Sequence, residues 1–476
     1  MIKFLTKGIL RDRSRSLFPV IVVTLTVAMI VLFQGFLTGI MNGMFLDSAV
    51  VSTGHVKIMT KAYHEENQLL PNDLALLDTE KLVRELNQEY PDDPDIAALY
   101  AASYMSIRRW DYWDSEGNPK AETIPVAEAL EHIIAQDLSH PGVLHLHIHL
   151  IEASLEPERA LVSADALEAT VPIGGHVVHM PAHIYVRVGQ YGKAVDNNVR
   201  SQAVDQQFAD LWGDHPLPNI GTYPLSHRIH AGHALDFIRY AATMQGNYKT
   251  ASEAAWRMAN RITGDAVIVR GGQKRVSAPW LVLKIFGKWD ELLALTPAHQ
   301  GTPYLDGIWS YALGSAHLAK GNVDAALQEL VNLKTIAEAP NADEYRVGAT
   351  PASAVLQLAA FGLEGEVLMA QDDLSGAIEA FRAGVAIEDQ NNYTEPPDWA
   401  QPMRHYLGAA LLKAGQPEAA EAVYRRDLRW NQNNGWSLFG LHQALAARNE
   451  QSEASQVFNQ WQEAWAEADV TLTASH

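Results

Sequence analysis

Cysteine is absent from the 476 residues of this chain. Disulfides, thiolate nucleophiles and Cys-ligated zinc or iron–sulfur sites are therefore excluded. The patterns GxSxG and GxxxxGKS/T are also missing, so the sequence offers neither a serine-hydrolase elbow nor a phosphate-binding P-loop. Any metal ion must be held by His, Asp, Glu or backbone groups.

Positive charge is scarce. The chain carries 36 Lys and Arg against 56 Asp and Glu, which gives a formal net charge of −20. A sequence-independent nucleic-acid binder needs a basic stripe to neutralise phosphates, so we expect no nucleic-acid partner. Hydrophobic residues make up 47% of the chain, and its length exceeds what one compact core usually serves. This combination favours an array of amphipathic helices.

The sequence has one long apolar run, which ends at Ile40, and no comparable run follows it. Residues Leu17–Ile40 contain no charged side chain, and this length spans a bilayer. The positive-inside rule places the N-terminus in the cytoplasm and the rest of the chain outside it. A cleaved signal peptide and a buried core helix are the alternatives. The basic residues before this run are Lys3, Lys7, Arg11, Arg13 and Arg15, against the single acid Asp12.

The domain boundary is expected where the sequence turns polar and acidic, before Asp95. Pro91 and Pro94 interrupt helix on either side of this point. We divide the chain into a basic N-terminus with a transmembrane helix (1–45), a connecting segment (46–94), a His-rich helical part (95–235) and further helical repeats (236–476).

Glycine and alanine recur at fixed spacings beyond the boundary. Four glycine–alanine pairs at a spacing of five residues and three at a spacing of twelve stand out. In the first set the glycine would end one helix, and the alanine would sit where the next helix crosses it. In the second set the two small residues would face each other across a helical hairpin. The first set is Gly189/Ala194, Gly246/Ala251, Gly321/Ala326 and Gly415/Ala420; the second is Gly314/Ala326, Gly365/Ala377 and Gly408/Ala420, with bulky Leu330, Phe381 and Tyr424 following.

These spacings resemble the tetratricopeptide repeat, as in WSYALGSAHLAKGNVDAALQEL and RHYLGAALLKAGQPEAAEAVY. We expect an all-α fold, a tetratricopeptide-like α-solenoid of helix-turn-helix pairs preceded by one N-terminal transmembrane helix. Residues 95–476 also resemble a group of bacterial tetratricopeptide-repeat proteins through RRWDYWD and HPGVLHLHIHLIEAS. The resemblance implies a concave face that binds a protein or peptide partner.

The first 90 residues resemble a different family. MIKFLTKGILRDRSRSLFPVIVV and the later STGHVKIMTKAYHEENQLLPNDLALLD are similar to the start of an ABC-transporter permease of the lipoprotein-releasing and macrolide-exporter type. Together the two resemblances imply a place at the bacterial inner membrane, with the helical repeats outside the cytoplasm. Such permeases carry further membrane helices, and no second apolar run follows here. The segment is expected to act as an anchor or to be a fusion relic.

Histidine is concentrated in one band. Twelve of the 19 histidines lie between His132 and His233. Several share a helix face at spacings of three, four or seven residues, although Pro181 interrupts one set. Imidazoles with a carboxylate suit Zn, Fe, Cu or Mn. The predicted metal ligands are His145, His149 and Glu152; His176, His179 and His183; and His227 with His230.

Other histidines of the band are expected to be hydrogen-bonded core residues. His147 points away from the face of its neighbours, and His233 has drifted off the face of His227 and His230. The same reading applies to His132, His140 and His215.

Three functions remain open on the sequence alone. The first is a membrane-tethered scaffold with a metal-binding inner face that holds a protein partner. The second is a metal-dependent hydrolase or oxidase in which Glu152 is a ligand or general base, while Tyr185 and Arg187 orient a ligand or anion. Ordinary repeat packing is the alternative for Tyr185 and Arg187. The third is a permease fragment.

Overall fold

The computed structural model describes residues 79–108, 110–114, 116–172, 174–212, 219–220, 223–224, 227–268 and 270–476, together with Val27 and Met29 alone in the N-terminal segment. The expected membrane helix at 17–40 and the permease-like segment lie outside the described residues apart from those two positions. The chain divides into two compact units, residues 1–77 with 214–226, and residues 78–213 with 227–476.

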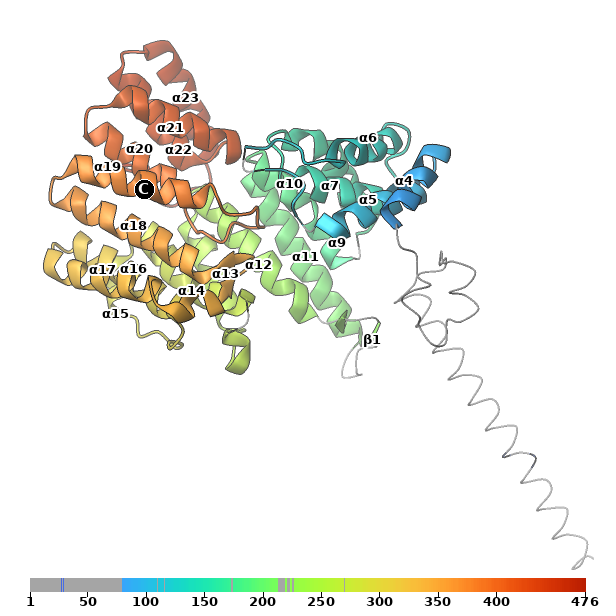
Figure 1. The fold of residues 1–476 in the computed structure, drawn as a ribbon, viewed down its shortest axis with the longest axis horizontal. Helices are drawn as coiled ribbons and strands as arrows, with labels where there is room; N and C mark the ends of the chain where they lie inside the picture. Colours follow the sequence, from blue (N-terminus) through green and yellow to red (C-terminus); the bar gives the residue numbers. More distant parts are fainter. Residues whose placement is uncertain are drawn as a thin grey trace, which may run out of the picture. The chain divides into compact units, whose positions relative to one another are not determined.

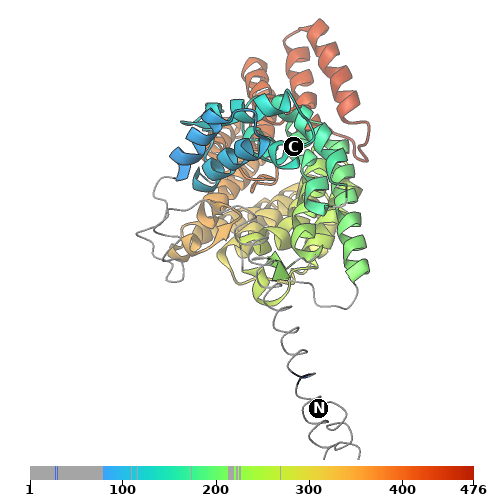
Figure 2. The same cartoon turned by 90° about the vertical axis from the view of Figure 1, so that its right-hand side faces the viewer.

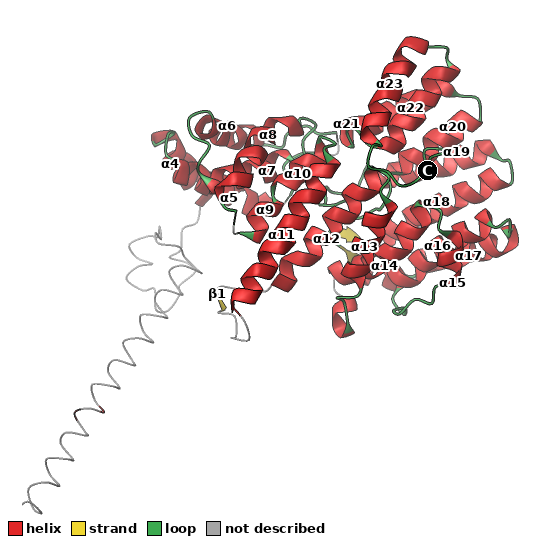
Figure 3. Ribbon diagram, turned by 180° about the vertical axis from the view of Figure 1, so that it is seen from behind, coloured by secondary structure: helices red, strands yellow, loops and turns green. Residues whose placement is uncertain are grey.

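Helices dominate the second unit (Figure 3). Its helices are α4 (Thr79–Glu89), α5 (Pro94–Arg108), α6 (Thr123–Ile134), α7 (Pro141–Ile151), α8 (Leu161–Thr170), α9 (Gly175–His179), α10 (Pro181–Arg187), α11 (Tyr191–Trp212), α12 (His227–Met244), α13 (Tyr248–Ala259), α14 (Arg270–Ile285), α15 (Trp289–Ala294), α16 (Pro303–Ala319), α17 (Val323–Ala337), α18 (Ala352–Ala370), α19 (Leu374–Glu388), α20 (Met403–Lys413), α21 (Pro417–Trp430), α22 (Gly435–Ala447) and α23 (Gln451–Ala464). Short 3-10 turns lie at Pro157–Ala160, Gly264–Val267 and Pro340–Glu344.

Strands are short where the structure describes them. In the second unit, β3 (Arg346–Val347) pairs antiparallel with β4 (Thr350–Pro351). In the first unit, β1 (Asn219–Ile220) pairs antiparallel with β2 (Tyr223–Pro224).

Sequential helices pack as hairpins that stack on their neighbours (Figure 1). Pairs such as α16 with α17, α18 with α19 and α20 with α21 each contact the following helix as well. This is the expected tetratricopeptide-like solenoid. Helix α4 packs against α5, and Val83 is buried there, so the described part of the array extends back to Thr79, ahead of the expected boundary at Asp95.

The predicted glycine turns are confirmed. Gly189, Gly246, Gly321 and Gly415 all adopt φ between 71° and 77°, the left-handed conformation that ends a helix at little cost only for glycine. The alanines five residues later, Ala194, Ala251, Ala326 and Ala420, are fully buried.

The twelve-residue spacing has a different structural reason from the one expected. A Cβ at Gly365 would lie 2.4 Å from Phe381, and one at Gly408 would lie 2.3 Å from Tyr424, so each glycine receives the bulky ring of the following helix. At Gly314 the intruding side chain is Leu363, from the next hairpin. Each of these glycines therefore makes room for a large side chain, and does not face the alanine twelve residues further along the chain.

The solenoid curls until distant repeats touch, as the end-on view in Figure 2 illustrates. The Tyr191 hydroxyl donates to the Gln432 carbonyl at 3.0 Å, and Trp436 Nε1 donates to the Thr243 carbonyl at 2.9 Å. Asp469 accepts hydrogen bonds from the first backbone amides of α13. These contacts join α11, α12 and α13 to α22 and to the segments that follow α21 and α23.

Helix α18 is the one helix among the described residues that is long and apolar enough to cross a membrane. More than half of its apolar window is buried inside the array. It packs against α16, α17 and α19, and Leu356, Leu358 and Leu363 are fully buried there.

Candidate metal centre

Helix α7 presents His145, His149 and Glu152 toward one side, as its periodicity predicts. His140 caps the helix, because its Nδ1 accepts a hydrogen bond from the Val143 amide at 3.1 Å, and Pro141 fills the first turn. His147 lies on the other side, fully buried, with Nδ1 2.8 Å from Ser163 Oγ. The prediction of a hydrogen-bonded core role for His147 is confirmed.

A break at Met180 separates the second histidine set into two short helices. α9 carries His176 and His179, and Pro181 starts α10, which carries His183. Met180 itself keeps a right-handed helical conformation, so the chain direction is nearly maintained across the break. All three imidazoles therefore reach the same region.

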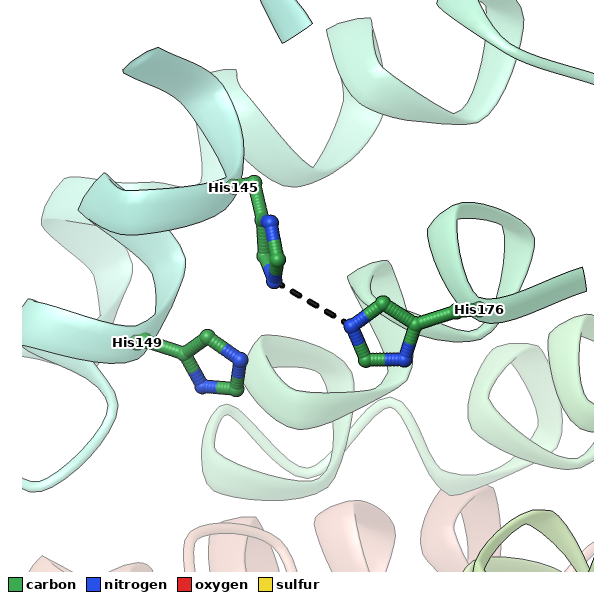
Figure 4. Close-up of side chains that lie close together, drawn as sticks. All are labelled: His145, His149 and His176. Atoms are coloured by element: carbon green, nitrogen blue, oxygen red, sulfur yellow. Dashed lines mark hydrogen bonds between the residues drawn. The ribbon is translucent and has the colours of Figure 1, made fainter. Parts of the chain in front are cut away.

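The first cluster, trio A, consists of His145, His149 and His176 (Figure 4). His145 and His149 come from α7 and His176 comes from α9, and one nitrogen of each ring faces the other two. One ligand nitrogen from each of the three lies within 4.8 Å of the others. The Nε2 atoms of His145 and His176 are 3.3 Å apart. Two imidazole nitrogens on one tetrahedral zinc are separated by about 3.4 Å, so His145 and His176 already have the spacing of two ligands of one ion.

The second cluster, trio B, consists of His179, His183 and His233, the last from α12. His179 and His183 are buried, and their Nε2 atoms lie 2.7 Å apart. The ring of His233 is 4.7 Å from that of His179. Sequence spacing had set His233 aside because it left the face of His227 and His230, yet the packing of α12 brings it into the cluster.

Second partners fix the tautomers of the trio B histidines. Asn198 Nδ2 donates to the Ala194 carbonyl, so Asn198 Oδ1 is the atom that accepts from His179 Nδ1 at 2.6 Å. His183 Nδ1 donates to Glu152 Oε2 at 2.9 Å. Both Nε2 atoms are thus turned toward each other. A separation of 2.7 Å is that of an N–H···N hydrogen bond, so one proton lies between the two rings. A metal ion bound by both rings would replace that proton and move the two nitrogens apart to about 3.4 Å.

Glu152 joins the two trios through one carboxylate. Its Oε1 accepts from His149 Nδ1 at 2.7 Å, while Oε2 accepts from His183 Nδ1. Glu152 is completely buried, and Tyr393 Oη also donates to it at 2.7 Å. A carboxylate behind a ligating histidine orients the ring and strengthens the ligand, and here one carboxylate does so for a histidine in each trio.

The electrostatics of the cluster follow from burial and from its two carboxylates. Burial alone would lower the pKa of His183, but Glu152 and Glu395 raise it to about 10. Burial alone would raise the pKa of Glu152, and His183 and His149 together lower it below its usual range. Burial lowers the pKa of His145 to about 3, and the neighbouring His149 and His183 act in the same direction. Neutral His145 is a ready metal ligand.

Glu395 and Tyr393 reach the cluster from a distant repeat. They lie on the connection between α19 and α20, more than 200 residues further along the chain than Glu152. Glu395 Oε2 is 2.5 Å from His183 Nδ1. The single N–H of that nitrogen points to Glu152, so Oε2 has no hydrogen-bond partner within the described part of the chain. Burial and Glu152 raise the pKa of Glu395.

The predicted ligand-orienting residues Tyr185 and Arg187 are engaged elsewhere. Tyr185 Oη donates to Asp165 at 2.6 Å. Arg187 is buried, stacks 4.1 Å from the Trp430 ring and donates to three backbone carbonyls, those of Glu152, Ser154 and Trp430. This geometry favours the packing alternative for both residues, with Arg187 holding the end of α7 against α21.

The remaining histidines of the band have varied surroundings. His227 and His230 fall in the first turn of α12, where the side chains lie outside the described part of the structure. His215 also lies outside it. His132 is hydrogen-bonded to Asp92 but exposed, so it is not the core residue expected.

Comparison with known proteins gives similarity only to solved structures. No protein-family model matches the chain, and no curated protein sequence does. The crystal structure of the APC/C hetero-tetramer Cut9-Hcn1 aligns over 82% of this chain and 56% of that chain, with a TM-score of 0.30 and 15% identity. The structure of Naa15/Naa10 bound to HypK-THB aligns over 85% and 75%, with a TM-score of 0.21 and 10% identity. This chain spans just over half the length of the first.

Proposed function

We propose that the chain is a helical-repeat metalloprotein that binds two divalent transition-metal ions, one in trio A and one in trio B, and uses them for hydrolysis of a small substrate. The observation that carries this proposal is the double role of Glu152. It holds the Nδ1 atoms of His149 and His183 at 2.7 and 2.9 Å, and so turns the Nε2 atoms of both rings toward the other histidines.

Three imidazoles with an open fourth position form the ligand set of a catalytic zinc. A metal in such a site lowers the pKa of a bound water to near neutrality. A metal held by either trio would supply a nucleophile from water. Glu395, whose Oε2 has no hydrogen-bond partner among the described residues and whose pKa is raised by burial, would hold the proton released from that water. It would return the proton to the leaving group as the bond between that group and the substrate carbon or phosphorus breaks.

The all-imidazole composition of the trios also narrows the metal. Neither trio contains a carboxylate, and imidazole ligands suit Zn, Cu, Fe and Ni better than the oxygen-seeking Mn or Mg. Copper bound by three histidines in each of two adjacent positions would favour an oxidase. Metal identity therefore separates this second candidate from the hydrolase.

The position of the α19–α20 connection favours a small ligand over a peptide at this site. Tyr393 contacts Glu152 and Glu395 contacts His183, so this connection lies against the cluster. Lys274 Nζ donates to the Pro396 carbonyl at 2.9 Å and holds the connection against α14. A protein partner on the concave face and a membrane tether through residues 17–40 stay predictions.

Elemental analysis of the purified full-length chain tests the proposal. We expect close to two equivalents of Zn, Cu or Fe per chain, with loss of metal in His149→Ala and His183→Ala. His132→Ala is the matched control, because this exposed histidine lies in the same band but outside both trios. A parent protein that neither carries nor takes up metal, with both variants melting like the parent, overturns the proposal.

A further inference from the structure

A cavity of about 220 Å³ opens beside trio B. His233 and Glu395 line it, so they belong both to the cluster and to the cavity wall. Trp110, Lys274 and Arg275 line the same space. Its volume is below the roughly 300–1,000 Å³ of pockets for drug-sized ligands, so it fits a molecule of metabolite size.

Most charges around the cavity neutralise one another. Lys274 Nζ lies 3.1 Å from Asp236 Oδ2 and 3.3 Å from Asp398 Oδ1. Asp236 also pairs with Arg239 at 2.7 Å. Asp398 Oδ2 accepts from the amide and hydroxyl of Thr350. None of these groups has its full charge available for a ligand.

Arg275 is the exception. Within the described residues no hydrogen bond or ion pair reaches its guanidinium, although the side chain is half-buried. It lies against the glycine backbone of α12, because a Cβ on Gly232 would lie 2.8 Å from Arg275 Cζ. A Cβ on Gly271 would make only an ordinary contact, at 3.6 Å. Glycine at position 232 therefore leaves room for the flat guanidinium.

A partly desolvated guanidinium without a partner is costly, and an oxyanion that accepts two parallel N–H bonds removes that cost. We propose that Arg275 binds the anionic group of the substrate, a carboxylate or a phosphate, and thereby directs the rest of that small molecule toward His233 and the metal in trio B. The placement of the substrate's reacting group beside the metal rests on the proposed function. The anion contact itself depends only on Arg275 and the cavity.

Calorimetric titration of the full-length chain with inorganic phosphate, and separately with acetate, tests the inference. We expect Arg275→Met to lower the affinity for the preferred anion at least tenfold. Arg275→Lys should lower that affinity less, because lysine keeps the charge but loses the planar guanidinium. The titration whose affinity falls more in Arg275→Met shows whether the site prefers a phosphate or a carboxylate. Arg382→Met is the matched control, since Arg382 is exposed on α19.

The outcomes separate this inference from the metal proposal. Equal anion affinity in the parent and in Arg275→Met, or no binding of either anion to the parent, overturns the anion site. Metal content measured on the same samples should be unchanged in Arg275→Met. If the parent holds no metal while anion affinity still depends on Arg275, the metal proposal falls and the anion contact stands.

Discussion

Asn198 sets the orientation of His179. Its amide nitrogen donates to the Ala194 carbonyl at 2.7 Å within α11, which leaves its oxygen 2.6 Å from His179 Nδ1. Both residues are completely buried, so water cannot replace either hydrogen bond. The direction of one amide therefore decides which nitrogen of His179 faces His183.

Replacing Asn198 by Ala should weaken metal binding in trio B by about 10- to 100-fold, the usual effect of removing the partner behind a ligating histidine. Trio A should keep its affinity, because Asn198 contacts neither His145 nor His176. Metal competition with a chelator measures both sites. A uniform loss at both sites would mean that the substitution acts through general unfolding, and a melting curve of the same sample distinguishes this.

The two trios predict separable metal losses. His176→Ala should remove one equivalent and leave the other, and His233→Ala should do the converse, because each residue belongs to a single trio. Elemental analysis of the two single variants and of the double variant gives the stoichiometry. If each single variant loses all metal, the centre holds one ion across both trios.

Glu152→Gln should weaken metal binding at both trios. Glutamine offers only one acceptor oxygen, so it can receive an N–H from His149 or from His183 but not from both. Tyr393→Phe removes a single donor to the same carboxylate and should cost about 1 kcal/mol of stability while metal stays bound. Elemental analysis with denaturant unfolding separates the two effects. Equal metal content in the parent and in Glu152→Gln contradicts the shared role.

Arg187→Met should destabilise the fold by about 3 kcal/mol, because three buried carbonyls lose their donor. Tyr185→Phe is the comparison, since it removes one hydrogen bond, to Asp165, and should cost about 1 kcal/mol. Urea unfolding gives both values. A metal loss without destabilisation in Arg187→Met would instead return Arg187 to a ligand-orienting role.

Glu388 should make stability depend on pH. Burial raises its pKa to about 8, with Asp427 and Asp389 acting in the same direction and the Met403 amide and Arg404 opposing. The folded protein then holds a proton that the unfolded chain releases above about pH 4.5, so this contribution to stability is complete below that pH and is lost as the pH rises to 8.

Glu388→Gln keeps the neutral form at every pH. It should match the parent near pH 4 and exceed it by about 4–5 kcal/mol above pH 8, because each unit of the rise in pKa from 4.5 to about 8 corresponds to about 1.4 kcal/mol. Unfolding across this range measures the difference. Glu379→Gln, on the exposed face of the same helix, should show no such crossover. A constant offset between parent and Glu388→Gln at all pH values contradicts the assignment.

Local spacing predicted what one helix can encode. The shared face of His145 and His149 follows from a period of 3.6 residues, and so does the opposite position of His147. The glycine turns at Gly246 and Gly415 were equally readable, because a positive φ is a local requirement.

Residues supplied by tertiary packing were not predictable in this way. Glu395 lies in an irregular connection with no periodicity, and it reaches His183 only because the solenoid curls. His233 was not predicted as a metal ligand because it leaves the face of His227 and His230 on its own helix. Its ring instead contacts that of His179, which lies on another helix. The one available signal for Glu395 was its place in a long, proline-containing connection between repeat helices. That signal does not show which residues Glu395 contacts.

The reach of Glu395 also has a consequence for biosynthesis. The ribosome completes all six imidazoles of the two trios by His233, but Tyr393 and Glu395 emerge about 160 residues later. At roughly 5–20 residues per second, nascent chains expose the histidines for at least several seconds before these partners exist. Metal captured in that interval would meet incomplete surroundings, so selection of the correct ion belongs to the finished superhelix.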